Sequence, residues 1–363
     1  MSDDPRGPGT ASGAAAISRP PGVRGLIRSL AHRLAGARPA LPVEGRLAPF
    51  GGATGWLNSP PLTPEGLRGR VVLVDFWTYT CVNWLRTLPY VRAWAAEYAA
   101  AGLTVVGVHT PEFGFEHDVA NVTAAARALD VGYPIALDND YAVWGAFANH
   151  AWPAVYLADG EGRIRYHHDG EGEYAATEMA IQQLLLEAGA GDIDQDLVMV
   201  EPRGLEVAAD WRTLRSPETY AGYRQTTGFA QEDVARPDAP AGYAAPARLP
   251  LNSWGLAGTW TVAGDAAVAD APGGRVAFQF HARDLNLVMG PATRGGPAVP
   301  FRVSLDGQPA GGAYGADVSP DGRGVVADQR TYQLIRQPGP IAARRFEIEF
   351  DAAAVAVYCF TFG

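Results

Sequence analysis

The stretch from Val71 to Tyr90, VVLVDFWTYTCVNWLRTLPY, constrains the fold of this chain more than any other. Its first residues are almost continuously apolar and β-branched, which is typical of a short central strand covered on both faces. From Val82 onward, apolar residues recur at spacings of three and four, which predicts an amphipathic helix. Cys81 stands between these two elements. The sequence therefore predicts a strand, a turn and a cysteine in the first turn of a helix.

The position of Cys81 favours a reactive thiol. Unpaired N–H groups and the dipole at a helix N-terminus stabilise a negative charge, so we expect this thiol to ionise more easily than a free cysteine. Thr78 and Thr80 can offer hydroxyl groups to a thiolate. Thr78 also has the spacing of the threonine–cysteine pair of peroxiredoxins. Val74, however, stands where the full peroxiredoxin pattern has a proline, which makes a peroxidase the less favoured interpretation.

Further blocks along the chain resemble one protein family. They include WLNSPPLTPEGLRGR before the central strand, HTPEF at 109–113, YPIALDNDYAVW at 133–144, WPAVYL at 152–157 and GEGEY at 170–174. These blocks are similar to those of thioredoxin-like redoxins of the DipZ and TlpA-like family, over about 41–188 and more weakly over 217–363. The resemblance implies a thioredoxin-like fold with a kinking proline at Pro89. It also implies a cis Pro153 that faces Cys81 and, with Trp152, presents the extended chain of a substrate.

The sequence departs from the family at Trp84, where the second cysteine of a C-x-x-C pair would stand. A mixed disulfide or a sulfenic acid on Cys81 must then be resolved by an external thiol, glutathione or a thioredoxin-type protein. Cys359 is an alternative resolving group. Because it alternates with Val355 and Val357 in the final apolar run, we expect it instead to be a buried core residue.

Several other side chains are candidates for the site. Glu112 and His109 follow the apolar run 103–108, at the strand end where open α/β folds place ligands, and either can act as a proton carrier for Cys81. Arg86 can steer anionic thiols or remain solvated. A shallow groove for a peptide or small ligand is expected between the aromatic side chains, which otherwise serve as packing: Trp77, Tyr79, Trp84 and Trp152.

The pattern of elements predicts an α/β thioredoxin-like fold followed by an all-β, jelly-roll-like sandwich. Strands alternate with helices up to about residue 189, whereas short alternating runs punctuated by Asp-Gly and Pro-Gly turns begin after residue 250. A short basic amphipathic helix at 25–37 is expected either to cap the domain or to lie on a membrane or partner. The expected divisions are an N-terminal segment at 1–40, a redoxin domain at 41–189, a linker with local structure at 190–249 and the sandwich at 250–363.

The composition and the N-terminal sequence limit the compartment and the kinds of partner that we expect for this protein. The net charge of −10 argues against nucleic acid as a main partner. With two cysteines in 363 residues, no disulfide framework is expected. The N-terminus has no secretory pattern, and no run approaches the ~20 apolar residues of a membrane span, so we expect a cytoplasmic protein. Nothing in the sequence calls for a metal or a cofactor.

Two hypotheses for function follow. The first is a monothiol oxidoreductase in which Cys81 is the nucleophile and Thr78 and Glu112 assist it. It would act on an oxidised protein or a peroxide and be completed by an external thiol. The second is a redox-inactive thioredoxin fold that serves as a binding scaffold beside a ligand- or carbohydrate-binding sandwich.

Overall fold

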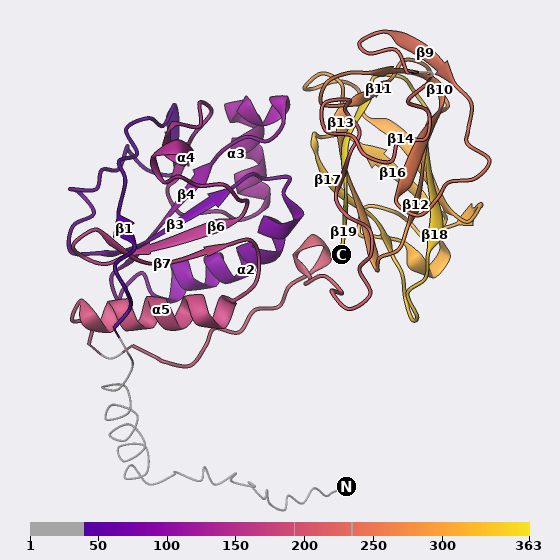
Figure 1. The fold of residues 1–363 in the computed structure, drawn as a ribbon. Helices are drawn as coiled ribbons and strands as arrows, with labels where there is room; N and C mark the ends of the chain where they lie inside the picture. Colours follow the sequence, from indigo (N-terminus) through magenta and orange to yellow (C-terminus); the bar gives the residue numbers. More distant parts are fainter. Residues whose placement is uncertain (1–39, 192, 234) are drawn as a thin grey trace, which may run out of the picture. The chain divides into compact units, whose positions relative to one another are not determined.

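The computed structural model describes residues 40–191, 193–233 and 235–363, and residues 43–363 form one compact unit. The amphipathic helix expected at 25–37 lies outside the described residues. Figure 1 follows the chain from an α/β domain into a domain made of strands.

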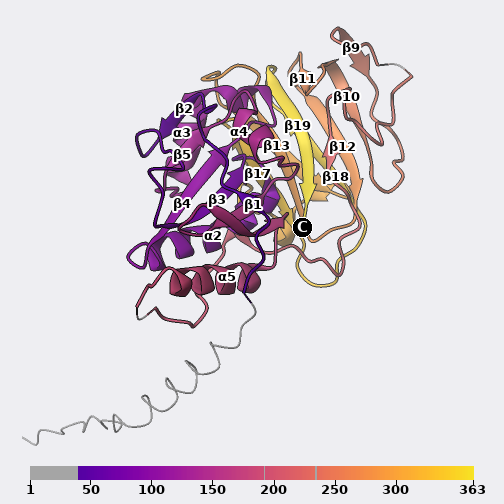
Figure 2. The same ribbon diagram turned by 60° about the vertical axis from the view of Figure 1, so that its left-hand side comes forward.

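The first domain is built on the predicted central strand. The elements of this part are β1 (Gly45–Arg46), β2 (Gly55–Leu57), β3 (Val71–Trp77), α2 (Val82–Glu97), β4 (Leu103–His109), η1 (Gly114–His117), α3 (Val119–Ala128), β5 (Ile135–Leu137), α4 (Ala142–Ala146), β6 (Ala154–Ala158), β7 (Arg163–Asp169) and α5 (Tyr174–Glu187). Within the described residues the strands form one sheet in the order β1-β7-β6-β3-β4-β5-β2. β3 is fully buried and pairs parallel with β4 and antiparallel with β6, as expected for a strand that is apolar on both faces. α2 and α5 lie on one face of this sheet, and α4 lies on the other (Figures 1 and 2). α3 lies beside α2, because Arg92 of α2 donates to the carbonyl of Leu129, the residue that ends α3, at 2.6 Å.

The second domain is a β-sandwich, as the turn-punctuated runs predict. Its elements are η2 (Gly204–Glu206), β8 (Thr219–Tyr220), β9 (Pro240–Tyr243), β10 (Ser253–Val262), β11 (Ala267–Ala269), β12 (Gly274–Phe280), β13 (Asp284–Pro291), β14 (Val299–Leu305), β15 (Gln308–Pro309), η3 (Gly311–Ala313), β16 (Arg323–Val326), β17 (Arg330–Arg336), β18 (Arg344–Phe350) and β19 (Val355–Phe362). β8 and β9, from the stretch expected to be a linker, pair with β19 and β10. That stretch therefore supplies edge strands to the sandwich.

The two layers of the sandwich are connected through β10. Its first half pairs with β12 in one layer, and its second half pairs with β9 and β11 in the other. Gly258 lies at the change of layer with a φ of +94°, a conformation that glycine adopts without steric cost. The core between the layers is rich in large buried side chains, among them Trp254, Trp260, Phe278 and Phe346. Both tryptophans are fully buried core anchors, so neither offers an exposed face to a sugar.

Candidate functional site

Cys81 lies where β3 turns into α2. It is the N-cap residue of α2, and its N–H donates to the carbonyl of Thr78 at 3.2 Å. The thiol is partly buried and lies 3.7 Å from the carbonyl oxygen of Trp152, its acceptor. The Trp152-Pro153 bond is cis. The structure thus brings Cys81 and the Trp152-Pro153 loop together at the end of the sheet.

The surroundings of Cys81 do not make its thiol acidic, which corrects the expectation from its position. The backbone N–H groups of Asn83 and Trp84 do lower its pKa, as a helix N-terminus should. Burial raises the pKa more strongly, and the charges of Glu112 and Glu218 raise it further. The net effect is a thiol that is held protonated, so its ionisation requires a base.

Glu112 is the group best placed to be that base. It follows β4, is half-buried, and accepts a hydrogen bond from the hydroxyl of Tyr220 in β8. Burial, followed by the charges of Glu218 and Glu116, raises the pKa of Glu112 to about 8. A carboxyl group with such a pKa exchanges its proton near neutral pH, where an ordinary glutamate is fully ionised.

Glu116 is a site residue that was not identified from the sequence. Its buried carboxylate accepts hydrogen bonds from the Thr80 hydroxyl at 2.7 Å and from the N–H groups of Glu112 at 2.7 Å and Phe113 at 2.9 Å. Thr80 is also held from the second domain, because the Thr331 hydroxyl donates to its carbonyl at 2.7 Å. Glu116 therefore fixes the loop that carries Glu112 against the turn that carries Cys81. An acid four residues after Glu112 in a short loop was the only available signal.

Thr78 supports the turn differently from the prediction. Its carbonyl holds the N–H of Cys81, whereas its hydroxyl lies beside Glu116 and lowers the pKa of that carboxyl group. The backbone of Thr78 thus positions the cysteine. Its hydroxyl is buried and has no hydrogen-bond partner in the described part of the chain.

Trp77 and Trp84 lie in the core and do not wall a substrate groove, which corrects a second expectation. Both are fully buried, and their rings stack at 4.2 Å. The indole N–H of Trp84 donates to the carboxylate of Asp75 at 3.0 Å, and the Tyr133 hydroxyl lies 3.3 Å from the same oxygen. Burial raises the pKa of Asp75 to about 7. The signal for Asp75 was present in the sequence as a single acid within the apolar run of β3.

Trp152 differs from these two tryptophans because part of it remains exposed. Its ring packs on Trp144 with centroids 4.5 Å apart, and its indole N–H has no partner in the described part of the chain. Trp152 and the buried Pro153 are therefore the predicted substrate-contact residues that still border the thiol.

His109 and Arg86 do not have the roles considered for them. His109 is completely buried between Trp77 and Tyr79, and burial lowers its pKa to about 3. It is therefore neutral at physiological pH. Arg86 is buried rather than solvated, since it pairs with Glu171 at 2.9 Å and donates to the carbonyl of Phe362 at 3.0 Å.

Cys359 faces the first domain, not the core of the sandwich. Val355 and Val357 belong to that core, but the pairing of β19 with β13 shifts by one residue between Val288 and Met289. This β-bulge reverses the faces of the strand, so Phe360 points into the core and Cys359 packs in a cluster with Phe113. Cys359 is thus buried in a hydrophobic cluster, as expected, although strict alternation with Val355 and Val357 does not give the face on which it lies.

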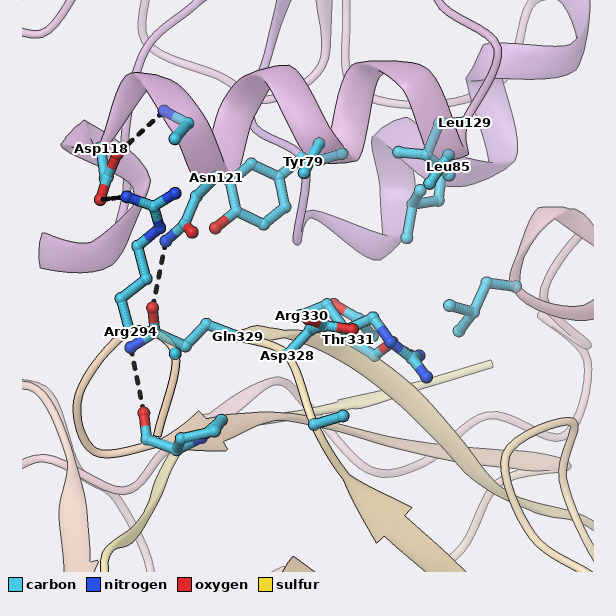
Figure 3. A pocket seen from close by; sticks show the side chains of 18 residues that line it. Tyr79, Leu85, Asp118, Asn121, Leu129, Arg294, Asp328, Gln329, Arg330 and Thr331 are labelled. Atoms are coloured by element: carbon cyan, nitrogen blue, oxygen red, sulfur yellow. Dashed lines mark hydrogen bonds and ion pairs between the residues drawn. The ribbon is translucent and has the colours of Figure 1, made fainter. Parts of the chain in front are cut away.

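A cavity of about 780 Å³ borders the active-site turn. Figure 3 shows Tyr79, Leu85, Asn121 and Leu129 on one wall and Arg294, Gln329 and Arg330 on the other. Two contacts bridge the walls: Asn121 donates to Gln329 at 3.1 Å, and Arg294 pairs with Asp118 at 3.0 Å. The Tyr79 side chain is buried, and its pKa is raised, chiefly by burial.

The described residues contain neither a candidate metal site nor a candidate membrane-spanning helix. No group of three or more His, Cys, Asp or Glu side chains in this part of the chain is arranged to hold a metal ion. None of the helices found within it has the length and apolarity that crossing a membrane requires.

Comparison with known proteins assigns both domains. Residues 61–167 match the AhpC/TSA family, and residues 216–363 match the thioredoxin-like C-terminal domain. Thiol-disulfide oxidoreductase YkuV of Bacillus subtilis is 28% identical over 136 residues, which are 38% of this chain and 91% of that protein. A solved structure described as a thioredoxin-like protein in the oxidised form is 29% identical, covering 40% of this chain and 97% of its own, with a TM-score of 0.37. The family matches thus assign the first domain to the AhpC/TSA family and the second to the thioredoxin-like C-terminal domain.

A further relative is similar to this chain over most of its length. Protein DipZ of Mycobacterium bovis is 35% identical over 317 residues, which are 86% of this chain and 42% of DipZ. The predicted resemblance is thus confirmed, and the chain is a homologue of DipZ. It spans less than half the length of these relatives.

Proposed function

We propose that this protein is a monothiol oxidoreductase in which Cys81 reacts with a disulfide and Glu112 carries the proton. The observation that supports this most directly is the pairing of a protonated thiol with a carboxyl group whose pKa is about 8. The likeness to YkuV, named as a thiol-disulfide oxidoreductase, supports the same reaction class.

The exchange step balances with the residues at the site. Glu112, as carboxylate, takes the proton of the Cys81 thiol, and the thiolate attacks a substrate disulfide RS–SR. The bond Cys81 S–SR forms while the S–S bond of the substrate breaks, and the departing RS⁻ receives the proton from Glu112 as RSH. Trp152 and Pro153 border the attacked sulfur and supply the contact surface for the chain of an extended substrate.

Completion of the cycle requires a second thiol. Trp84 stands where a C-x-x-C pair would have its resolving cysteine, so this position has no sulfur to attack a mixed disulfide on Cys81. The Trp84 side chain is buried and donates a hydrogen bond to Asp75. An external thiol R′SH, such as glutathione or a thioredoxin-type protein, attacks Cys81 S–SR, regenerates the Cys81 thiol and leaves as RS–SR′. A cytoplasmic location with its pool of reduced thiols is part of this proposal.

Reduction of a peroxide uses the same groups. The thiolate attacks ROOH, giving a sulfenic acid on Cys81 and ROH, and an external thiol then forms the mixed disulfide and water. The Thr78 hydroxyl makes no hydrogen bond to the sulfur in the described part of the chain, whereas the peroxiredoxin pattern would require one. Disulfide exchange is therefore the preferred reaction.

The decisive experiment is to treat the purified chain with glutathione disulfide and to locate glutathione by mass spectrometry. We expect a mixed disulfide on Cys81 in the wild type and in Cys359→Ser, and none in Cys81→Ser. Addition of reduced glutathione should release it. Absence of the mixed disulfide across pH 6 to 9, in folded protein, would rule the proposal out.

A binding scaffold is the second candidate, and two observations favour it. The pKa of Cys81 is raised rather than lowered, and a cavity of about 780 Å³ adjoins the turn. If the protein is a binding scaffold, Cys81 should be unreactive, and a bound ligand should protect the folded chain against thermal unfolding. Cys81→Ser should then leave that protection unchanged.

A further inference from the structure

The side chains at the boundary between the two domains form a continuous series next to the thiol. The hydroxyl of Tyr220 contacts an oxygen of Glu112 on one side and an oxygen of Glu218, at 3.3 Å, on the other. Glu218 also hydrogen-bonds the thiol of Cys359, and the charge of Glu112 acts on Cys81. The series therefore begins at one cysteine of the chain and ends beside the other.

The single O–H of Tyr220 limits which side chains of this series can be protonated at the same time. A phenol has one O–H, so Tyr220 can donate to one carboxylate only. If both contacts are hydrogen bonds, the other acid must carry a proton and donate it to the phenol oxygen. Two neighbouring carboxyl groups also avoid double ionisation, because the second negative charge is repelled by the first.

We propose that Glu112 and Glu218 share one proton through Tyr220, so that the second domain tunes the acid–base group of the thiol site. This inference rests on the proposed function only for its catalytic consequence. Glu112 is half-buried and its charge acts on the Cys81 thiol, whereas Glu218 is exposed and meets solvent. Glu218 can thus exchange its proton with water, and transfer from Glu218 to Tyr220 and from Tyr220 to Glu112 leaves Glu218 ionised and Glu112 neutral. Tyr220 and Glu218 are positioning residues in this arrangement.

The surroundings of Glu112 support the assignment. Burial, Glu218 and Glu116 raise its pKa, and the hydrogen bond from Tyr220 lowers it. No cation is among the main influences on Glu112, so neutralisation by a proton is the available means of lowering the charge. The titratable groups that interact with it come from α2, η1, the start of α4, β8 with its preceding residue, and β19: Cys81, Glu116, Tyr141, Tyr220, Glu218 and Cys359.

The test uses the full chain labelled with ¹³C at the glutamate carboxyl carbons, in a Cys81→Ser background. Glu112→Gln assigns the signal of Glu112, whose titration is then followed by NMR. Glu218→Gln should move this titration to lower pH, because it removes a neighbouring negative charge. Tyr220→Phe should move it to higher pH, because it removes a hydrogen bond to the carboxylate. These opposite directions distinguish a shared proton from a structural role, which shifts neither or both alike.

Matched controls accompany each variant. Tyr223→Phe also removes a tyrosine hydroxyl bonded to a carboxylate, Asp238 at 2.9 Å, but far along the chain from Glu112, and Glu201→Gln neutralises an exposed glutamate. Both should leave the Glu112 titration unchanged. Shifts of Glu112 in the same direction in Glu218→Gln and Tyr220→Phe, or no shift, would overturn the proposal.

The catalytic consequence is measured separately with Cys81 intact. The rate of mixed-disulfide formation should rise with pH over the range in which Glu112 loses its proton. In each variant, the pH at which the rate rises should shift in the same direction as the Glu112 titration measured by NMR. If the wild type forms no mixed disulfide, the proposed function fails while the NMR titration still decides whether the proton is shared. If the reaction occurs but its pH profile does not follow Glu112, the sharing has no catalytic role and this inference is overturned.

Discussion

Asp75 and Glu112 are two desolvated carboxyl groups in the same domain, yet their surroundings give them opposite roles. Burial is the main cause of the raised pKa of each, to about 7 for Asp75 and about 8 for Glu112. Asp75 is sealed in the core by Trp84 and Tyr133. Glu112 lies in a loop beside Cys81 and contacts Tyr220 of the second domain. The comparison shows that a raised pKa alone does not identify a catalytic acid, and the role proposed for Glu112 rests on its electrostatic influence on Cys81 as well.

The largest effect is expected for Glu112→Gln. This variant removes the base without changing the size of the side chain, so mixed-disulfide formation at Cys81 should slow on the order of 10²-fold. Stopped-flow kinetics with a disulfide probe near pH 7 measure it. Glu65→Gln, at an exposed position of the same domain, should react at the wild-type rate. Equal rates for both variants would place Glu112 with Asp75 as a structural acid.

The converse is expected for Asp75→Asn, a change of stability with little change in reactivity. Because the pKa of Asp75 is raised on folding, ionisation costs the native state stability as pH rises from about 4 through about 7. Asparagine keeps an acceptor for Trp84 and removes that cost. The variant should be more stable than the wild type by roughly 2 to 4 kcal/mol near pH 8, with the difference vanishing near pH 4. Urea unfolding at both pH values tests this, and a variant that is less stable near pH 8 would contradict it.

A smaller effect is expected for Trp84→Phe. The variant leaves the Asp75 carboxylate without its indole donor and should cost about 1 to 3 kcal/mol near pH 8. In an Asp75→Asn background the charge is absent, so the cost of the same substitution should shrink. A double-mutant cycle by urea unfolding measures this coupling. A coupling of zero would mean that Trp84 contributes only packing.

The smallest effect is expected at the contact between the domains. Thr331→Val keeps the shape of the side chain but removes the donor to the carbonyl of Thr80, at a cost of about 1 kcal/mol. Since Thr80 precedes Cys81, the alkylation rate of the cysteine should also change. Thr331→Ser retains the hydroxyl and should restore both values. If Thr331→Val and Thr331→Ser have the same stability and the same alkylation rate of Cys81, the second domain does not position the turn that carries Cys81.

Much of the fold was predictable because its signals are local. The apolar run of β3, the three- and four-residue spacing of α2 and the turn-punctuated runs of the second domain each reflect contacts within one element. The position of Cys81 as the N-cap of α2 and its closeness to the Trp152-Pro153 loop follow from the same order of elements.

The sequence by itself determined the class of the fold, the place of the thiol and the presence of Trp84 where a C-x-x-C pair would have its second cysteine. Only the tertiary structure decided the chemistry around that thiol. The pKa of Cys81 depends on burial and on Glu112 and Glu218, which are 31 and 137 positions away in the numbering of the chain. The bulge that turns Cys359 toward Phe113, and the indole that binds Asp75, likewise depend on pairing between distant segments. Desolvation and long-range contacts leave no periodic pattern in a sequence, and they set the charge of every group at this site.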